Sequence, residues 1–301
     1  MGTPGVAVTG LARAAFSAFR VSIRLRVISP WAYLNWLVFP VLFAAVGLYV
    51  LSSPGAASSH VVYGVLGGGL IGYWSVAYLE GGNGIQEERW NGTLEQIFAT
   101  PTPLWVILLG KICGGLLFGL LAFLPTAAFA YVGFHAVLPA LDGGRFVISL
   151  GVLTLSFFCI ALTLTPLFAL WRWAFSMLNG FELGVYVLSF FCIALTLTPL
   201  FALWRWAFSM LNGFELGVYV LCGFMFPVAV LAPWAQGVAG FLAPTWAVRA
   251  LYASTLAEGP HNFATWWLAA IGLSLAYLAG AYFLYALVER RARMSGQLAL
   301  A

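Results

Sequence analysis

Residues 85–111, IQEERWNGTLEQIFATPTPLWVILLGK, place several charged side chains between two apolar runs: Glu87, Glu88, Arg89 and Glu95. The rest of the chain has little charge, since 7% of its 301 residues are charged and 63% are hydrophobic. A soluble domain carries roughly 25% charged residues. The mean hydropathy is +0.98, and several apolar runs reach the roughly 20 residues that cross a bilayer as a helix. The sequence therefore predicts an all-α polytopic membrane protein with a charged loop between two spans.

Seven apolar segments are expected to be helical: 31–52, 61–79, 103–133, 147–170, 181–203, 214–232 and 264–288. Basic residues flank these segments unevenly, and the positive-inside rule places all of the following in the cytoplasm: Arg13, Arg20, Arg24, Arg26, Arg89, Lys111, Arg290, Arg291 and Arg293. Both termini are then cytoplasmic, as in a multi-pass protein of the cell membrane. This arrangement requires an even number of crossings.

A perfect internal repeat accounts for the odd number of segments. Residues 155–187 recur without a change at 188–220. Internal repeats of transporters are detectable only as weak similarity, so this identity indicates a recent tandem duplication or an error in the sequence. We expect six functional spans, with the seventh segment as an addition.

The first 30 residues are expected to form a cytoplasmic amphipathic helix that precedes a transmembrane domain over 31–301. At 100° per residue, Arg13, Arg20 and Arg24 lie on one face of the segment 10–28, while Arg26 points away from it. Such a helix suits the plane of the lipid headgroups. A simple positive flank that sets the topology is the alternative interpretation.

The charged loop is expected to contain a short helix of its own. Residues Gly81, Gly82, Asn83 and Gly84 are predicted to break the preceding helix, and Pro101 and Pro103 to begin the next. A short amphipathic helix between them suits docking into a groove of a soluble partner. The alternative is a solvated cap at the membrane edge.

Two blocks of this sequence resemble the ABC-2 type transporter permeases. The first is Glu88-Arg89-x-x-Gly92-Thr93-Leu94-Glu95, followed by Ala99-Thr100-Pro101 and Leu108-Leu109-Gly110-Lys111. The second, looser block comprises Gly223-x-x-x-Pro227, Pro233-Trp234 and Pro244-Thr245-Trp246. The duplication departs from the family pattern between 171 and 213.

The resemblance implies a six-span, type V-like bundle with a coupling helix at 85–100 and a re-entrant element at 233–250. The residues implied to contact an ATP-binding subunit are Glu87, Glu88, Arg89, Gly92, Thr93, Leu94, Glu95 and Pro101. The residues implied for the re-entrant gate are Gly223, Pro227, Pro233 and Pro244. The resemblance further implies a second permease copy, most simply in a homodimer, and export of a drug, an antibiotic or a lipid-like compound.

The motor itself is not expected in this chain. A phosphate-binding loop needs G-x-x-x-x-G-K-[ST], and Trp105 and Ile112 occupy two of its required positions around Gly110-Lys111. ATP is therefore expected on a separate subunit, and no cofactor, metal or nucleic acid on this chain. The alternative function is an integral-membrane lipid-modifying enzyme. The carboxylates lie at span ends or in loops, however, where catalysis within the membrane does not use them.

Overall fold

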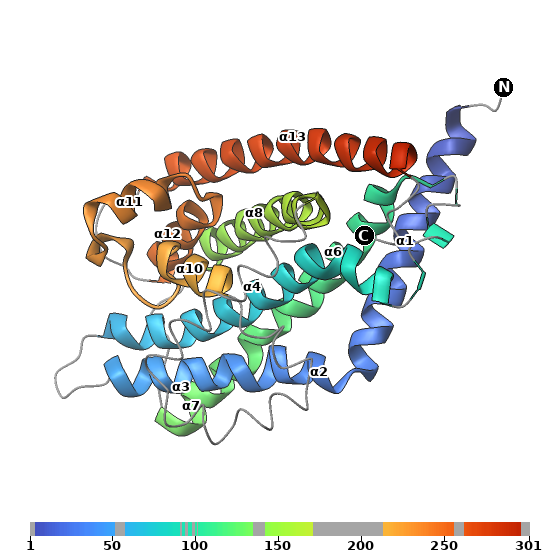
Figure 1. Ribbon diagram of the computed structural model, residues 1–301. Coiled ribbons are helices and arrows are strands. Elements are labelled where there is room, and N and C mark those ends of the chain that lie inside the picture. Colours follow the sequence, from blue (N-terminus) through green and yellow to red (C-terminus); the bar gives the residue numbers. More distant parts are fainter. Residues whose placement is uncertain are drawn as a thin grey trace, which may run out of the picture.

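The computed structural model describes residues 4–51, 58–90, 92–93, 96–97, 100, 102–134, 142–170, 213–255 and 262–295 (Figure 1). Within these ranges the chain is mostly helical and contains no strand. Four helical segments there are long and apolar enough to cross a membrane: Val61–Gly81, Leu104–Gly133, Gly143–Leu167 and Phe263–Val288. Four of the predicted segments are thus confirmed as helices of spanning length and composition, while the predicted segment 181–203 lies outside the described residues.

The first predicted span is helical but interrupted. It comprises α2 (Pro30–Tyr33), a π-helical turn (Leu34–Val38) and α3 (Phe39–Leu51). Pro40, in the first turn of α3, has no N–H to donate to the carbonyl four residues earlier, so the regular ladder cannot continue through this point. The helix widens locally into a single π-helical turn just before this proline, and such single turns inside α-helices are the usual form of the rare π-helix.

The third predicted span is also made of two helices. The helix α6 (Leu104–Gly119) continues through a 3₁₀ turn (Leu120–Ala122) into α7 (Phe123–Phe134). Pro125 lacks the N–H that would bond to the Leu121 carbonyl, and its ring crowds that carbonyl. The tightened turn therefore lies where the sequence removes a helical hydrogen bond.

The segment predicted to span at 214–232 is not one continuous helix. The helix α10 (Gly213–Leu221) ends at Leu221, well before the predicted end of this span. A turn, a short 3₁₀ segment (Val228–Val230) and α11 (Pro233–Gly240) follow it. The prediction of a span reaching residue 232 is therefore wrong.

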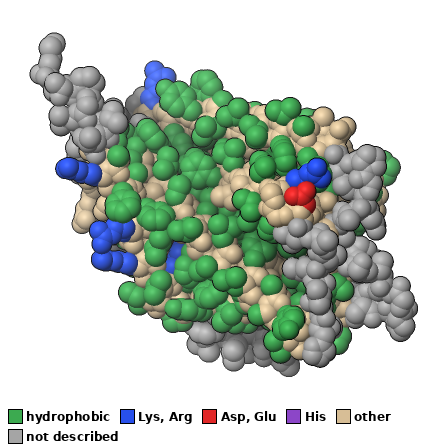
Figure 2. All heavy atoms as spheres, turned by 180° about the vertical axis from the view of Figure 1, so that it is seen from behind, with side chains coloured by type: hydrophobic (Ala, Val, Ile, Leu, Met, Phe, Trp, Pro, Cys, Tyr) green, Lys and Arg blue, Asp and Glu red, His purple; other side chains and the backbone are tan. Residues whose placement is uncertain are grey.

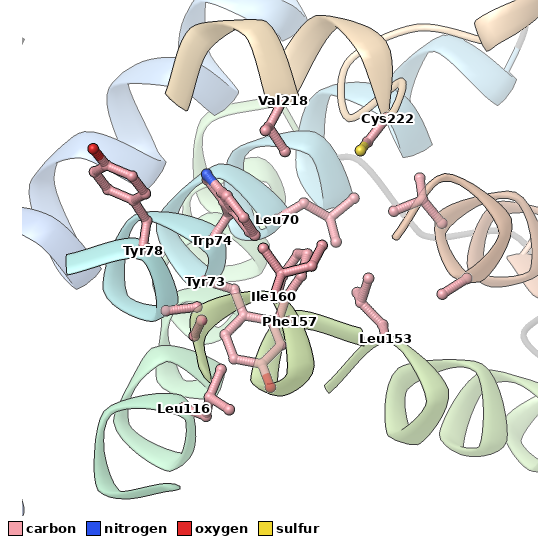
Figure 3. Close-up of a cluster of buried hydrophobic side chains, with 14 of the residues drawn as sticks. Leu70, Tyr73, Trp74, Tyr78, Leu116, Leu153, Phe157, Ile160, Val218 and Cys222 are labelled. Carbon is pink, nitrogen blue, oxygen red and sulfur yellow. The ribbon is translucent and has the colours of Figure 1, made fainter. Parts of the chain in front are cut away.

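The bundle has a long helix at its centre. The helix α4 (Ser58–Trp90) packs against α3, α6, α7 and α8 (Gly143–Leu170), and α13 (Phe263–Ser295) covers α8 on the other side (Figure 1). Aromatic side chains of α4 fill the middle of the core together with α8, and Trp74 lies 5.1 Å from Phe157, ring centre to ring centre (Figure 3). The helix α4 therefore contacts most of the other helices of the bundle.

Small residues allow these helices to approach closely. A Cβ on Gly68 would lie 2.5 Å from the Pro40 carbonyl oxygen of α3, and one on Gly110 would lie 2.2 Å from the Ala15 carbonyl oxygen of α1 (Pro4–Ile28). Gly68 and Gly110 therefore lie where the backbone of a neighbouring helix leaves no room for a side chain. Membrane helices with small residues at the interface pack in this way.

The helix α1 runs across the end of the bundle, at a steep angle to α3 and α4 (Figure 1). Arg13, Arg20 and Arg24 are exposed on it, and basic side chains gather at this edge of the molecule beside a largely hydrophobic face (Figure 2). An amphipathic N-terminal helix is therefore present, and it lies across the direction of the spans.

Candidate functional site

The charged stretch begins as a continuation of α4. This helix passes through Gly81–Gly84 and ends at Trp90, so the prediction that these glycines break the helix is wrong, although its apolar, membrane-length part does end at Gly81. A Cβ on Gly81 would lie 2.6 Å from the Ala161 Cα of α8, and one on Gly84 would lie 3.0 Å from Leu108 of α6. Packing against two neighbouring helices outweighs the helical cost of glycine, which is about 1 kcal/mol per residue.

Gly92 ends α4 with a left-handed residue. Its φ is +68°, and the Thr93 N–H donates to the Glu88 carbonyl oxygen at 3.0 Å. This bond is the six-to-one bond of a Schellman motif, in which glycine is favoured at the left-handed position. The glycine of the permease-like signature therefore has a structural role here as a helix terminator.

The Glu88 side chain is bound within the molecule. Its carboxylate accepts a hydrogen bond from Lys111 Nζ at 2.8 Å and another from the Thr93 hydroxyl. Burial alone would raise the pKa of the Glu88 carboxyl, but the bonds from Lys111 and Thr93 and the lysine charge together hold that pKa below its ordinary value. Glu88 is thus an ionised group that links the end of α4 to α6.

A second ion pair attaches α1 to the same region. Arg26 of α1 forms a salt bridge with Glu80 of α4, and the Ser22 hydroxyl donates to the Lys111 carbonyl oxygen at 3.2 Å. A Cβ on Gly115 of α6 would lie 2.3 Å from Glu80 Cγ, so this glycine leaves space for the Glu80 side chain. The arginine that disturbs the polar face of α1 therefore points inward to a carboxylate.

After Gly92 the chain makes a further helical turn. The Ile97 N–H donates to the Thr93 carbonyl oxygen at 3.0 Å, and the Thr100 N–H donates to that of Ile97 at 3.1 Å. The side chains of Glu87 and Arg89, and residues Leu94, Glu95 and Pro101, lie outside the described part of the structure. Their predicted contact with a partner stays a prediction.

The sequence alone does not predict the pairing of these charges. Lys111 appears there as one of the basic residues that orient the chain and as part of the Gly110-Lys111 pair, and nothing in the sequence connects it with Glu88 or Arg26 with Glu80. The available signal was the position of each group near a span end, because an ionisable side chain at membrane depth usually requires an opposite charge.

The second group of predicted residues lies at the opposite end of the bundle (Figure 1). Gly223 has a φ of +70°, and the N–H groups of Gly223 and Phe224 donate to Val220 and Tyr219 at 3.2 and 3.0 Å. Both bonds of a Schellman motif are present, and the rings of Phe224 and Tyr219 pack with centres 5.7 Å apart.

Two short helices follow this turn. Pro233 is the first residue of α11, where a missing N–H costs nothing, and Pro244 is the second residue of α12 (Ala243–Thr255). The helix α12 is largely buried and packs against α8 and α13. Trp246 Nε1 donates to the Gly240 carbonyl oxygen at 2.9 Å, so this bond links the start of α12 to the end of α11.

The described residues contain no group of three or more His, Cys, Asp and Glu that is placed to hold a metal ion. The chain matches no family model, no curated protein and no solved structure.

Proposed function

We propose that this chain is the permease subunit of an ATP-binding cassette transporter of the ABC-2 type. The observation that carries the proposal is the segment that follows α4, whose described residues 92–93, 96–97 and 100 we call the turn and which leaves α4 at the end of the bundle where α1 lies. This turn joins α4 to α6, and the Glu88–Lys111 ion pair ties the two helices together beside it. A separate ATPase subunit that bound the turn would therefore pull on two spans at once.

The carboxylates favour this function over the alternative lipid-modifying enzyme. The structure describes three acidic side chains, Glu80, Glu88 and Asp142, and each is paired with an arginine or lysine. A catalytic acid or base has to reach its substrate and to change its protonation state. Carboxylates engaged in ion pairs suit a structural role in a transporter better.

The coupling mechanism follows from how Glu88 is held. With its carboxylate bound to Lys111 and Thr93, Glu88 anchors the turn, while the neighbouring residues Glu87, Arg89 and Glu95 remain as candidates for contact with the ATPase. Closure of two ATPase subunits would move the turn together with α4 and α6. A second permease copy would complete the pathway, and the strongly exposed apolar face of α13, which includes Leu268 and Tyr282, suits contact with that copy or with lipid.

The proposal is tested by adding bulk to the turn without disturbing its cap. Gln96 is exposed, so Gln96→Trp should reduce copurification of an ATP-binding subunit from native membranes at least fivefold. Gly143→Trp is the matched control, because Gly143 is exposed at the opposite end and a side chain there meets nothing within 4 Å. If no ATP-binding protein copurifies with the wild-type chain, or if Gln96→Trp retains it fully, the assignment is wrong.

A further inference from the structure

A cavity of about 380 Å³ opens at the end of the bundle opposite α1. Its walls come from α4, the Gly223–Ala229 turn, α11, α12 and α13, and its lining includes Tyr63, Arg249, Tyr252 and Trp266. Ligand pockets in proteins have volumes of roughly 300–1,000 Å³ and are mostly apolar with a few placed polar groups. This cavity has both properties.

Arg249 gives the cavity a positive charge. Its guanidinium stacks 5.0 Å from the centre of the Trp246 ring, and the ion pairs among the described residues involve other basic groups: Arg26, Lys111 and Arg145. In the described part of the structure, therefore, no carboxylate neutralises Arg249. A half-buried arginine without a counter-charge favours an anion, because it has several N–H donors in a planar fork that fits carboxylate and phosphate oxygens.

The polar atoms around Arg249 are arranged by bonds within the protein. Gln236 Nε2 donates to the carbonyl oxygens of Ala229 and Leu231 at 3.2 and 2.7 Å, so this side chain is held in one orientation. The Tyr252 hydroxyl donates to the Phe224 carbonyl oxygen, and the Tyr63 ring lies 4.2 Å from the Tyr252 ring, centre to centre. The walls beside the arginine are therefore aromatic and fixed by contacts with the Gly223 turn.

We propose that this cavity binds an amphiphile through one anionic group, a carboxylate or a phosphate, at Arg249, with the apolar body against Tyr63, Tyr252 and Trp266. This inference rests on the proposed function in one respect only: it takes the bound amphiphile to be the compound that the permease transports. Binding itself requires neither the ATPase nor transport. If no binding is detected, the permease assignment can therefore still be correct. If the permease assignment is wrong, the binding site can still be present.

The test is equilibrium binding of radiolabelled dodecyl phosphate to the full-length protein in phosphatidylcholine nanodiscs, with empty nanodiscs as background. Dodecanol, which carries the same chain and an uncharged head, is the comparison ligand. We expect dodecyl phosphate to bind at least tenfold more tightly, because a hydrogen bond to a charged group is worth about 1.5–3 kcal/mol, and 1.4 kcal/mol corresponds to tenfold in affinity. Equal affinity for the two ligands would overturn the proposal.

Three variants locate the site. Arg249→Gln should weaken dodecyl phosphate binding tenfold or more, whereas Arg145→Gln should leave it unchanged, because Arg145 is an exposed arginine paired with Asp142 at 3.3 Å. Ala253→Trp keeps the charge but fills the cavity, since Ala253 lines it, and should also abolish binding. If Arg249→Gln does not fold, wild-type affinity in Ala253→Trp is by itself sufficient to contradict the proposal.

The source of the ligand is settled by replacing part of the phosphatidylcholine with phosphatidylglycerol. If phosphatidylglycerol competes with dodecyl phosphate in the wild type, and this competition disappears in Arg249→Gln, the occupant is an anionic membrane lipid. The absence of competition in the wild type would identify a compound taken from outside the bilayer. Competition that persists unchanged in Arg249→Gln would contradict a site at this arginine.

Discussion

Gly92 and Gly223 perform the same local task at opposite ends of the bundle. Each has a φ near +70° and lies just after the last turn of a helix, and the residue that follows each donates to a carbonyl five residues earlier. A residue with a Cβ adopts this conformation at a cost of roughly 1–3 kcal/mol. Both glycines belong to the two sequence blocks that resemble ABC-2 permeases, so two of the matched positions are explained by backbone geometry.

Gly223→Ala is expected to destabilise the protein by about 2 kcal/mol or more, from the left-handed backbone together with a steric clash. The new Cβ would lie 2.7 Å from Val228 Cγ2 and 2.8 Å from the Phe226 carbonyl oxygen. Gly217→Ala is the control within the same helix, because a Cβ there meets nothing within 4 Å; it should be neutral or stabilising. Thermal unfolding in detergent measures both, and equal midpoints for the two variants would contradict the assignment.

Glu88 should make stability depend on pH. The pKa of its carboxyl is lower in the folded protein than the ordinary value of 4.5, so the stability it contributes is present above that value and is lost as the pH falls through the lowered pKa. Glu88→Gln should therefore be less stable than the wild type at pH 7, and the difference should shrink towards pH 3. Unfolding midpoints across this range test the sign, and a difference that stays constant with pH would exclude an ionised Glu88.

At the scale of helices, the attachment of α1 depends on an ion pair rather than on amphipathicity alone. The side chains of Arg26 and Glu80 are only 13% and 11% exposed. Removing one member of a buried pair costs about 3–5 kcal/mol, because the other charge is left without a partner, whereas replacing both by apolar residues is often neutral. Comparing single and double substitutions of this pair therefore separates the contribution of the charges to stability from that of packing.

Glu80→Gln should lower stability by about 3 kcal/mol, and the double variant Arg26→Met with Glu80→Leu should recover most of that loss. Arg24→Met is the control, because Arg24 is exposed on the same helix and its loss should change stability by less than about 0.5 kcal/mol. Thermal unfolding of the four proteins measures the comparison. A double variant no more stable than Glu80→Gln would mean that the charges themselves hold α1 in place.

The helices show which features the sequence could predict. Long apolar runs identified four spanning helices, and the arginines identified α1, because length and composition fix these elements locally. The continuation of α4 through Gly81–Gly84 was not predictable in this way, since it depends on contacts with Ala161 and Leu108 that are distant in sequence. The same reason applies to the Glu88–Lys111 pair and to the early end of α10. Each is decided by which helices are neighbours, and periodicity in one segment does not contain that information.

At the scale of the whole molecule, the orientation in the membrane is a separate prediction. The exposed arginines of α1 lie at one end of the bundle (Figures 1 and 2), and the positive-inside rule places that end in the cytoplasm. Single cysteines at positions 5 and 298, in a chain without its native cysteines, should react with a membrane-impermeant maleimide only after the cells are opened. Labelling of position 298 in intact cells would mean that the number of crossings is odd.

The tandem repeat provides the most direct test of the overall design. The helix α8 takes its second half from the first copy, and α10 lies almost entirely in the second. The residues between them, 171–212, lie outside the described part. Because the copies are identical, deleting 171–203 gives the same chain as deleting 188–220. The shortened protein therefore retains every residue of the described helices.

We expect this deletion variant to fold with an unfolding midpoint equal to or above that of the parent, since no contact among the described residues is removed. Removal of one apolar segment also makes the number of segments even, so the cysteine at 298 should be shielded in intact cells whatever its accessibility in the parent. Deleting the 33 residues 102–134 is the matched control: it has the same length but removes α6 and α7, which have no second copy and whose Leu108 and Leu116 lie in the core, and it should not yield folded protein. Loss of folded protein in the repeat deletion as well would mean that the second copy supplies packing that α8 and α10 require.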